Sequence, residues 1–243
     1  MCTLTYRLTA QGYELYFNRD EQRSRPQAIQ PTVNTSLNAI YPIDPTGGGT
    51  WIAAQESGVT LALLNYYQAH KSPDSKNFTS RGVIIPHLLA NIDSIHDQLT
   101  NMDLTVFQAF QLCVFDGDLS IGKEELATQY VWDGKGLTIS SLSTSKSLPI
   151  TSSGVDFEIV SEYRQQQFKK MITNVKATKN EYIAYHEHQG ELGKCSVKMY
   201  REDAKTVSFT QITVDQFQPL GKKVNLEYTD HFTASPEITS FTI

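Results

Sequence analysis

The sequence lacks the features that mark several large classes of protein. Its three cysteines, Cys2, Cys113 and Cys195, are an odd number in no CxxC arrangement, so they predict neither a disulfide framework nor a zinc knuckle. No stretch of the chain approaches the roughly 18 apolar residues of a membrane helix, and no dense run of Lys and Arg indicates a nucleic-acid partner. We therefore expect a cytoplasmic protein without a membrane span, whose partner is a small molecule.

The composition is that of an ordinary globular protein. Hydrophobic residues make up 40% of the 243 residues and charged residues 19%, which excludes the disordered and fibrous classes. The expected elements are strands, two helices, strands, a helix and strands again, with no repeating period. This order predicts one α+β domain over residues 1–243 rather than an alternating βαβ array. The sequence leaves open whether the protein forms a homo-oligomer.

Hydrophobic periodicity defines the expected helices and strands. Residues 24–31 and 72–80 are expected to be loops, and the last 25 residues follow no clear pattern. We expect strands at 2–10, 13–21, 51–55, 59–65, 110–117, 127–136 and 137–142, helices at 81–92, 94–102 and 157–174, and a strand, a charged turn and a strand over 195–214.

The first two of these strands form a predicted hairpin with a two-residue turn at Gln11-Gly12. With that turn, Cys2 lies opposite Glu21, and Arg19 lies beside Cys2 on the same, apolar face. Asp20 points to the opposite face, which reads as polar. The hairpin thus brings a cysteine and an arginine together at the start of the chain.

Cys2 is the strongest candidate for chemistry. Cysteine is small enough in second position for the initiator methionine normally to be removed, which would leave a thiol and a free α-amine on one residue. The amine has a pKa of about 7.7 to 8.0 and the thiol one of about 8.5, so the amine can take the thiol proton at neutral pH. Arg19 would stabilise the resulting thiolate. From its position alone, Cys2 is equally well explained as a small hydrophobic residue in a buried strand.

Short motifs occur in a particular order along the chain: MC at the start, FNRDE followed by SRP, then GGGTW, LLNYY and SRG, and finally MYREDAKTVSF. In this order they resemble the NRDE family, also called the transport and Golgi organisation protein 2 family. That family is similar to the N-terminal-nucleophile (Ntn) hydrolases, particularly the cysteine branch that contains penicillin V acylase and the bile-salt (choloylglycine) hydrolases. The resemblance implies a four-layer αββα sandwich of largely antiparallel sheets, with the N-terminal residue at the mouth of a sheet-lined cleft.

The resemblance also implies roles for individual residues. Cys2 matches the nucleophile of the branch, and Arg19 matches its arginine close to the thiol. The aspartate that holds the α-amine comes three residues after that arginine, whereas Asp20 follows immediately. Either a β-bulge re-aims Asp20, or Glu21 holds the amine instead. Asn65, at the end of VTLALLNYY, matches the asparagine that donates a hydrogen bond to the oxyanion.

Other positions match the branch less completely. Ser152 or Ser153 stands where the acylases place a second oxyanion asparagine, and serine reaches less far. Lys194 and Arg201 are the candidates for the late catalytic arginine of the branch. The two histidines of the HEH segment at 186–188 share a face only on a strand, and this segment is expected to be helical, so no metal site is expected.

Two functions remain after these comparisons of residues. The first is an Ntn amidohydrolase that cleaves a small-molecule amide at a non-peptide C–N bond through Cys2, with no metal or cofactor, and with Trp51 and Tyr66 binding the substrate. The second is a ligand-binding or carrier protein on the same fold, for haem, a lipid or an acyl group, in which Cys2 is an axial haem ligand or a structural residue. The replaced second asparagine and the shifted aspartate favour the second function.

Overall fold

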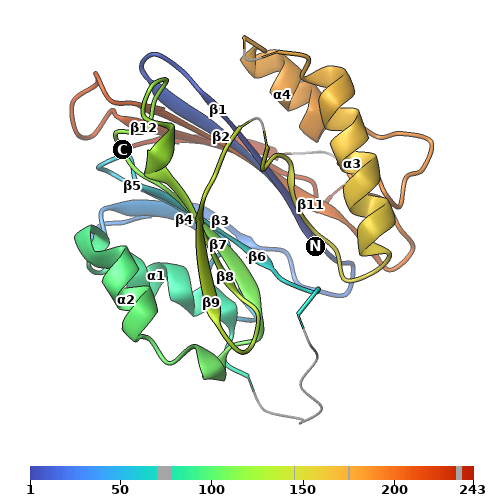
Figure 1. Ribbon diagram of the computed structural model, residues 1–243, viewed down its shortest axis with the longest axis horizontal. Coiled ribbons are helices and arrows are strands. Elements are labelled where there is room, and N and C mark those ends of the chain that lie inside the picture. The colour runs from blue at the N-terminus through green and yellow to red at the C-terminus, as the bar shows by residue number, and fades with distance from the viewer. Residues whose placement is uncertain (70–77, 145, 175, 234–236) are drawn as a thin grey trace.

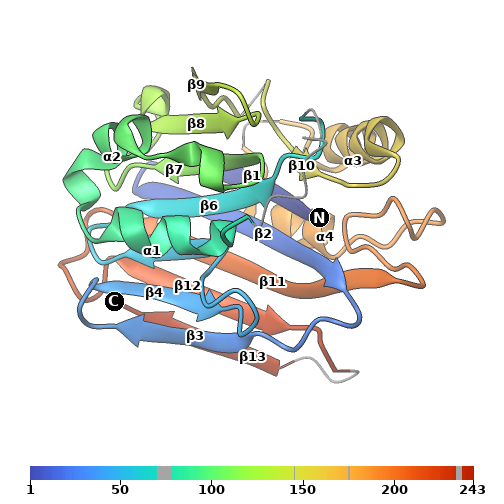
Figure 2. The same ribbon diagram turned by 90° about the horizontal axis from the view of Figure 1, so that it is seen from below.

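Two antiparallel sheets pack face to face in the computed structural model, and helices cover both outer faces (Figures 1 and 2). The structure describes residues 1–69, 78–144, 146–174, 176–233 and 237–243, so most of the loop expected at 72–80 lies outside the described residues. Within them, every pair of neighbouring strands in the two sheets is antiparallel. This arrangement confirms the predicted four-layer αββα sandwich.

The first sheet has the strand order β10-β1-β2-β11-β12-β13. Its outer face is covered by two helices, α3 (Phe157–Met171) and α4 (Lys179–His186). Because β1 lies between β2 and β10, the start of the chain is paired on both sides. The strands are β1 (Cys2–Leu8), β2 (Gly12–Gln22), β10 (Ile150–Ser152), β11 (Ala204–Asp215), β12 (Val224–Asp230) and β13 (Glu237–Thr242).

The second sheet runs in sequence order from β3 to β9. Its outer face shares an apolar cluster with two short helices, α1 (Ile84–Leu89) and α2 (Ile95–Asn101). None of the helices in the described segments is long and apolar enough to cross a membrane. The strands are β3 (Ile29–Asn34), β4 (Ala39–Ile43), β5 (Ile52–Gln55), β6 (Thr60–Asn65), β7 (Phe110–Phe115), β8 (Ala127–Trp132) and β9 (Leu137–Ser141), and the 3-10 helices are η1 (Arg81–Val83), η2 (Ile92–Ser94), η3 (Leu104–Val106) and η4 (Glu124–Leu126).

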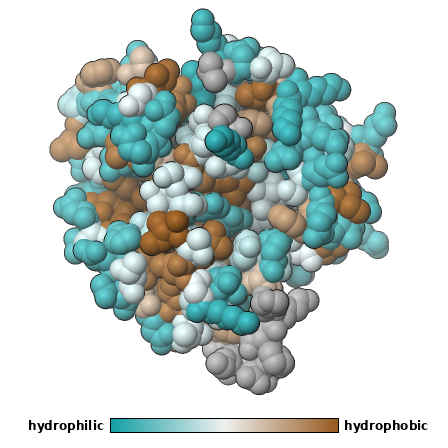
Figure 3. All heavy atoms as spheres, viewed as in Figure 1, coloured by the Kyte–Doolittle hydropathy of each residue, from teal (hydrophilic) through white to brown (hydrophobic). Residues whose placement is uncertain are grey.

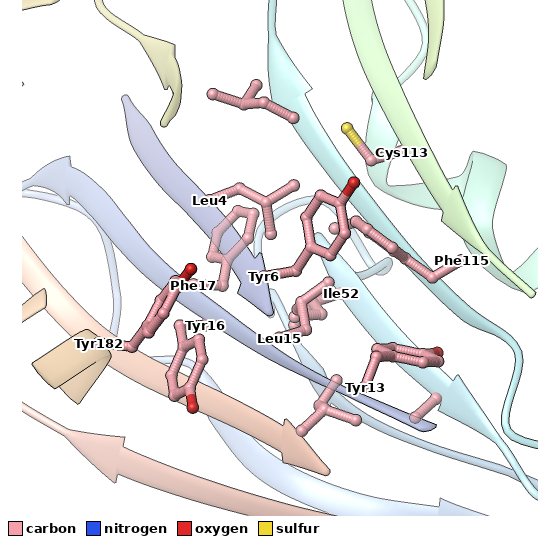
Figure 4. Packing of buried hydrophobic residues seen from close by; sticks show 14 of the residues in the cluster. Leu4, Tyr6, Tyr13, Leu15, Tyr16, Phe17, Ile52, Cys113, Phe115 and Tyr182 are labelled. Carbon is pink, nitrogen blue, oxygen red and sulfur yellow. The ribbon is translucent and has the colours of Figure 1, made fainter. Parts of the chain in front are cut away.

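Aromatic side chains fill the space between the two sheets (Figure 4). Tyr6 and Tyr13, from the first sheet, pack on Phe115 of the second, with ring centroids 5.0 and 5.8 Å apart. Leu4 and Leu15 are fully buried beside them. Burying a side chain of this size stabilises the fold by about 1.5–3 kcal/mol, so the apolar face of the first hairpin helps to hold β1 against the second sheet.

The predicted N-terminal hairpin is present, but its predicted register is wrong. Cys2 lies opposite Arg19 and not opposite Glu21. The turn lies at Ala10-Gln11, one residue earlier than predicted, since Thr9 donates its N–H to the Gly12 oxygen at 2.8 Å. Gly12 belongs to β2, where a Cβ would lie 2.2 Å from the carbonyl oxygen of Val214 on β11. The shift is an even number of residues, so each side chain keeps its predicted face, and Arg19 is still the neighbour of Cys2.

The polar face of this hairpin is buried beneath α3 and α4. Asn18 donates from Nδ2 to the backbone oxygen of His186 at 2.8 Å, and its Oδ1 lies 3.1 Å from His186 Nδ1. The other ring nitrogen, Nε2, lies 2.7 Å from the hydroxyl of Thr5. On the same face Tyr16 stacks on Tyr182 of α4, with centroids 5.2 Å apart (Figure 4). The polar residues of β1 and β2 therefore bind the helices rather than water.

Two elements differ from the prediction. The hairpin of β3 and β4 was not expected, because Pro31 and Pro42 argue against strands. Pro42 lies beyond the pairing of β4 with β5, and Pro31 lies at a register shift in the edge strand β3, so both positions tolerate proline. The strand expected from Cys195 is also wrong: apart from an isolated bridge at Tyr200, residues 195–203 form no strand.

His186 predicts a pH dependence of stability. Burial lowers the pKa of its imidazole to about 3, against about 6.5 in an unfolded chain. Below about pH 6.5 the unfolded chain therefore binds a proton that the folded chain does not, and the free energy of unfolding falls as the pH falls. Between pH 7 and pH 5 we expect a loss of about 2 kcal/mol from this residue, measured by urea denaturation at both pH values.

The matched control is the exposed His87. His186→Gln should be less stable than the wild type at pH 7 but should lose about 2 kcal/mol less between pH 7 and pH 5. His87→Gln should keep the wild-type pH dependence. An unchanged pH dependence in His186→Gln would contradict the assignment.

Candidate active site around Cys2

Cys2 lies at the N-terminal end of β1, and is 9% exposed. It pairs with Arg19 on β2 and with Ser152 on β10. The Ser152 hydroxyl donates to the backbone oxygen of Asn65 at 2.7 Å. Since Asn65 ends β6 of the second sheet, this bond joins the two sheets next to Cys2. The structure thus gathers four of the predicted site residues at one end of the sandwich.

Arg19 is buried between an aromatic ring and two carboxylates. Its guanidinium carbon lies 4.1 Å from the centroid of the Trp51 ring. Its Nη2 lies 3.3 Å from Oε2 of Glu21 and 3.6 Å from Oδ2 of Asp44. Arg25 binds the same carboxylates, at 3.6 Å and 2.5 Å respectively. This network fixes the guanidinium on the face of β2 that it shares with Cys2.

Glu21 does not take the position predicted for it. The corrected register moves it away from Cys2, and its side chain binds Arg19 and Arg25 instead. Its negative charge therefore acts on the arginine beside the thiol.

The GGGTW and SRG motifs contact each other. A Cβ on Gly49 would lie 2.2 Å from the carbonyl carbon and oxygen of Gly82, and Thr50 donates its backbone N–H to that oxygen at 2.9 Å. This contact places Trp51 over Arg19. It also positions Arg81, which donates from Nη1 to the backbone oxygen of Ala109 at 2.9 Å.

Arg81 is a second cation in the neighbourhood of Cys2 that the sequence prediction missed. Burial lowers the pKa of its guanidinium, and the nearby Tyr67 and Cys2 oppose that decrease. Its signal in the sequence was its place in the SRG motif, and in the structure it begins the 3-10 helix η1. Arg19 is thus the cation directly opposite Cys2, and Arg81 adds a second positive charge that interacts with the thiol.

The Asp20 carboxylate points to the helical side of the first sheet, as strand alternation predicts. It binds Nη2 of Arg164 at 3.0 Å and accepts from the hydroxyl of Thr206 at 2.6 Å. The side chains of Asp20 and Arg164 are both 0% exposed. No bulge in β2 re-aims Asp20; the register shift lies in the neighbouring strand, between Thr206 and Ser208 of β11.

Arg164 connects α3 to the N-terminal strand. Besides Asp20, it donates from Nη1 to the hydroxyl of Thr3 at 2.6 Å and to the backbone oxygen of Cys2 at 3.4 Å. Its Nε donates to the backbone oxygen of Cys195 at 3.4 Å. The sequence prediction missed Arg164, since a single arginine in an amphipathic helix reads as a solvent-exposed residue.

The backbone of Asp20, rather than its side chain, holds the N-terminus. The Met1 amine donates to the Asp20 oxygen at 2.9 Å, and the Asp20 N–H donates to the Met1 oxygen at 2.8 Å. The Met1 sulfur lies 3.1 Å from the hydroxyl of Ser153 and 3.7 Å from Nη1 of Arg201. Met1 therefore extends the β1–β2 ladder by one residue beyond Cys2.

The side-chain amide of Asn65 is hydrogen-bonded to a tyrosine. Its Nδ2 donates to the hydroxyl of Tyr67 at 2.7 Å, and the Tyr67 ring lies against Gly154, where a Cβ would be 3.2 Å from the ring. Tyr66 is half-buried, and its backbone N–H donates to the oxygen of Ala109 at 3.2 Å. The amide of Asn65 is thus a donor at the end of β6 that is bound to Tyr67 and lies close to Ser152.

The thiol is in its protonated form at neutral pH in the chain that begins with Met1. Burial raises the pKa of the Cys2 thiol above its ordinary value, against the opposing charges of the Met1 ammonium and Arg19. In the described part of the chain, no group of three His, Cys, Asp or Glu side chains could hold a metal ion. The groups gathered around Cys2 are a thiol, an amine and hydrogen-bond donors.

The fold is that of the Ntn hydrolases. The Caenorhabditis elegans ortholog of N-acylethanolamine-hydrolyzing acid amidase is 10% identical, with a TM-score of 0.57 over 90% of this chain and 94% of that one. Penicillin V acylase from Agrobacterium tumefaciens is 10% identical, with a TM-score of 0.57 over 100% and 86%. A mutant of the conjugated bile acid hydrolase from Clostridium perfringens is 12% identical, with a TM-score of 0.53 over 100% and 92%.

The chain belongs to the Transport and Golgi organisation 2 family, whose model matches residues 1–223. No curated protein matches the sequence. Family membership and the Ntn-hydrolase-like fold thus agree with the resemblance that the motifs indicate, while the roles of the individual site residues rest on the geometry described above.

The buried ion pair of Asp20 and Arg164 predicts a large effect on stability. Arg164→Met leaves a buried carboxylate without its partner, and such a change destabilises a protein by about 3–5 kcal/mol. The matched control is Lys179→Met, which removes a cation from the exposed pair with Glu227 and should cost less than about 1 kcal/mol. Urea denaturation measures both.

A double variant tests whether the pair acts as a unit. Arg164→Met combined with Asp20→Asn should be more stable than the sum of the two single effects predicts, because neither residue then leaves a buried charge unpaired. If Arg164→Met costs no more than Lys179→Met, the pair does not organise the N-terminal strand.

Proposed function

We propose that the protein is a cysteine Ntn amidohydrolase that cleaves a small-molecule amide. The observation that carries this proposal is the position of Cys2: it is directly opposite Arg19, and it follows a residue whose amine is held by the backbone of Asp20. Excision of Met1 moves the α-amine onto Cys2 itself, one residue closer to the thiol. The resting thiol then gains its own base.

The reaction begins with transfer of the thiol proton to the α-amine, with Arg19 stabilising the thiolate. The sulfur attacks the amide carbon, a C–S bond forms, and the carbonyl oxygen becomes an oxyanion. When the C–N bond breaks, the leaving amine takes the proton from the α-ammonium. Water then attacks the thioester and gives its proton to the departing sulfur, so the products are a carboxylic acid, an amine and the free thiol.

Asn65 is the proposed oxyanion donor. At the end of β6 its Nδ2 donates a hydrogen bond to the hydroxyl of Tyr67. A neutral amide remains a donor at every pH at which the protein is folded. Ser152 is bound to the backbone of Asn65 and orients it. In this proposal the buried carboxylate of Asp20 positions β2 through Arg164, while its backbone oxygen binds the amine of Met1 before Met1 is removed. Trp51 covers Arg19, and Tyr66 lies next to Asn65, where both can line the substrate.

The names of the similar structures support this class of reaction. Each is called an amidase, an acylase or a hydrolase, and each shares the four-layer arrangement that places the first strand of this chain. The substrate types in those names provide the first panel to test: an N-acylethanolamine, penicillin V and a conjugated bile acid.

A non-catalytic carrier of haem, a lipid or an acyl group is the second candidate. One observation favours it: the pKa of the Cys2 thiol is raised while Met1 is present, which disfavours the thiolate. A chain that keeps Met1 also has no free α-amine on Cys2. A haem titration that changes the absorption spectrum of the wild type, but not that of Cys2→Ala, would support this function in place of hydrolysis.

The processed thiol should react faster than the other two. In purified protein, intact mass should correspond to a chain that begins at Cys2, and iodoacetamide near neutral pH should modify Cys2 ahead of Cys113 and Cys195, which are 0% and 1% exposed. Cys2→Ser and Cys2→Ala should lose hydrolysis of any amide in the panel that the wild type cleaves, while Cys113→Ala keeps it. Full activity in both Cys2 variants would sink the mechanism.

The oxyanion assignment predicts an effect on kcat. Asn65→Ala should lower kcat about 100- to 1000-fold with a smaller change in KM, because the donor acts on the transition state. The matched control is Asn91→Ala, at an exposed asparagine between α1 and η2. A change in KM alone would assign Asn65 to substrate binding.

A further inference from the structure

A groove of about 250 Å³ lies on the α3 side of the first sheet, next to Met1. It is formed by the start of α3 and by the loop that precedes β11. The surface over α3 and α4 is otherwise mostly hydrophilic (Figure 3). The residues that line the groove are Val155, Asp156, Val160, Lys194, Cys195 and Arg201.

Arg201 is held in a fixed orientation. Its Nε and Nη2 donate to the two carboxylate oxygens of Asp203, at 2.9 and 2.6 Å. Nη1 takes no part in this paired contact and faces the sulfur of Met1 at 3.7 Å. A thioether is a weak acceptor, so this nitrogen presents charged N–H groups that a stronger acceptor would bind better. When Met1 is removed, the space that its sulfur occupies becomes free for another acceptor.

Two cations and one anion line the groove, and Arg201 is also paired with Asp203 beside it. Lys194 and Arg201 are its cations, and Asp156 is its anion; Nζ of Lys194 lies 3.8 Å from Oδ2 of Asp156. The side chain of Lys194 is 63% exposed, so it can turn toward a bound group at little cost. Of the two cations, Arg201 is the one that is preorganised, because Asp203 fixes it.

Two valines line the groove beside these charges. Val160 lines the groove and is buried, while Val155 is 49% exposed. Leu192 and Tyr200 lie elsewhere on the loop that carries Lys194 and Arg201, and are 51% and 63% exposed. Exposed apolar side chains beside fixed cations are the complement of a molecule with an apolar chain and an acidic end.

We propose that this groove binds the free carboxylate of an amphiphilic ligand, and that the amides cleaved at Cys2 are those that carry such a carboxylate. The second half rests on the proposed function. The link to Cys2 is Met1, whose side chain reaches Arg201 from the residue joined to the Cys2 nitrogen. A ligand group within one residue's length of that nitrogen therefore reaches the same guanidinium.

Binding is tested without any chemistry. Calorimetric titration of octanoate and of octanamide into the Cys2→Ala protein compares a carboxylate with a neutral amide of the same length. Octanoate should bind more tightly, and Arg201→Gln should weaken octanoate about tenfold, the effect of one charge-assisted hydrogen bond, while octanamide is unchanged. Lys194→Gln should weaken octanoate by a smaller factor. Since the Lys194 side chain is 63% exposed, that variant should fold.

Lys169→Gln is the matched control, since it removes the same charge from an exposed position of α3 outside the groove. Equal affinities for octanoate and octanamide, or an octanoate affinity that Arg201→Gln and Lys194→Gln leave unchanged, would overturn the proposal. If octanoate binds through Arg201 but the wild type hydrolyses no carboxylate-bearing amide, the hydrolase proposal fails and the groove assignment stands. If amides are hydrolysed with no preference for a carboxylate, the hydrolase proposal stands and the groove assignment fails.

Discussion

The ion pair between Asp20 and Arg164 is the constraint on which the N-terminal part of the structure depends. Taking two charges out of water carries a penalty of several kcal/mol per ion, which only close geometry and further hydrogen bonds offset. Here the carboxylate also binds Thr206, and the guanidinium also binds Thr3. Four elements, β1, β2, β11 and α3, must therefore meet at one point, and the start of the chain has a fixed place because of it.

The order of strands and helices in the sequence predicted an α+β domain, and the family resemblance of the motifs implied the four-layer sandwich. Alternation in the first hairpin correctly assigned Cys2 and Arg19 to the same face, and the motif order agreed with the family and the four-layer sandwich. The turn could not be predicted, because Gly12 begins β2 as a result of its approach to Val214, a contact made across the sheet. The β3–β4 hairpin was missed for a similar reason: its prolines are tolerated only because of where the pairing ends.

The candidate site was predictable to the extent that its residues lie in the hairpin or in the motifs. Asn65 and Ser152 were named from motif positions, and the structure joins them by a hydrogen bond. Arg164 and Arg81 were not, because one is a helix residue far along the chain and the other sits in a 3-10 turn. Both reach the neighbourhood of Cys2 only through packing of whole elements, which neither spacing nor periodicity records.

The backbone contact between Gly49 and Gly82 has a consequence for how this sequence can change. A side chain at Gly49 would collide with backbone atoms that cannot rotate away, and moving either segment would displace Trp51 from Arg19. Substitutions in one of the two loops are therefore tolerated only when they fit the other loop. Directed evolution or loop grafting in this protein should exchange the GGGTW and SRG segments together. A library that randomises only one of them consists mainly of variants in which Trp51 no longer packs on Arg19.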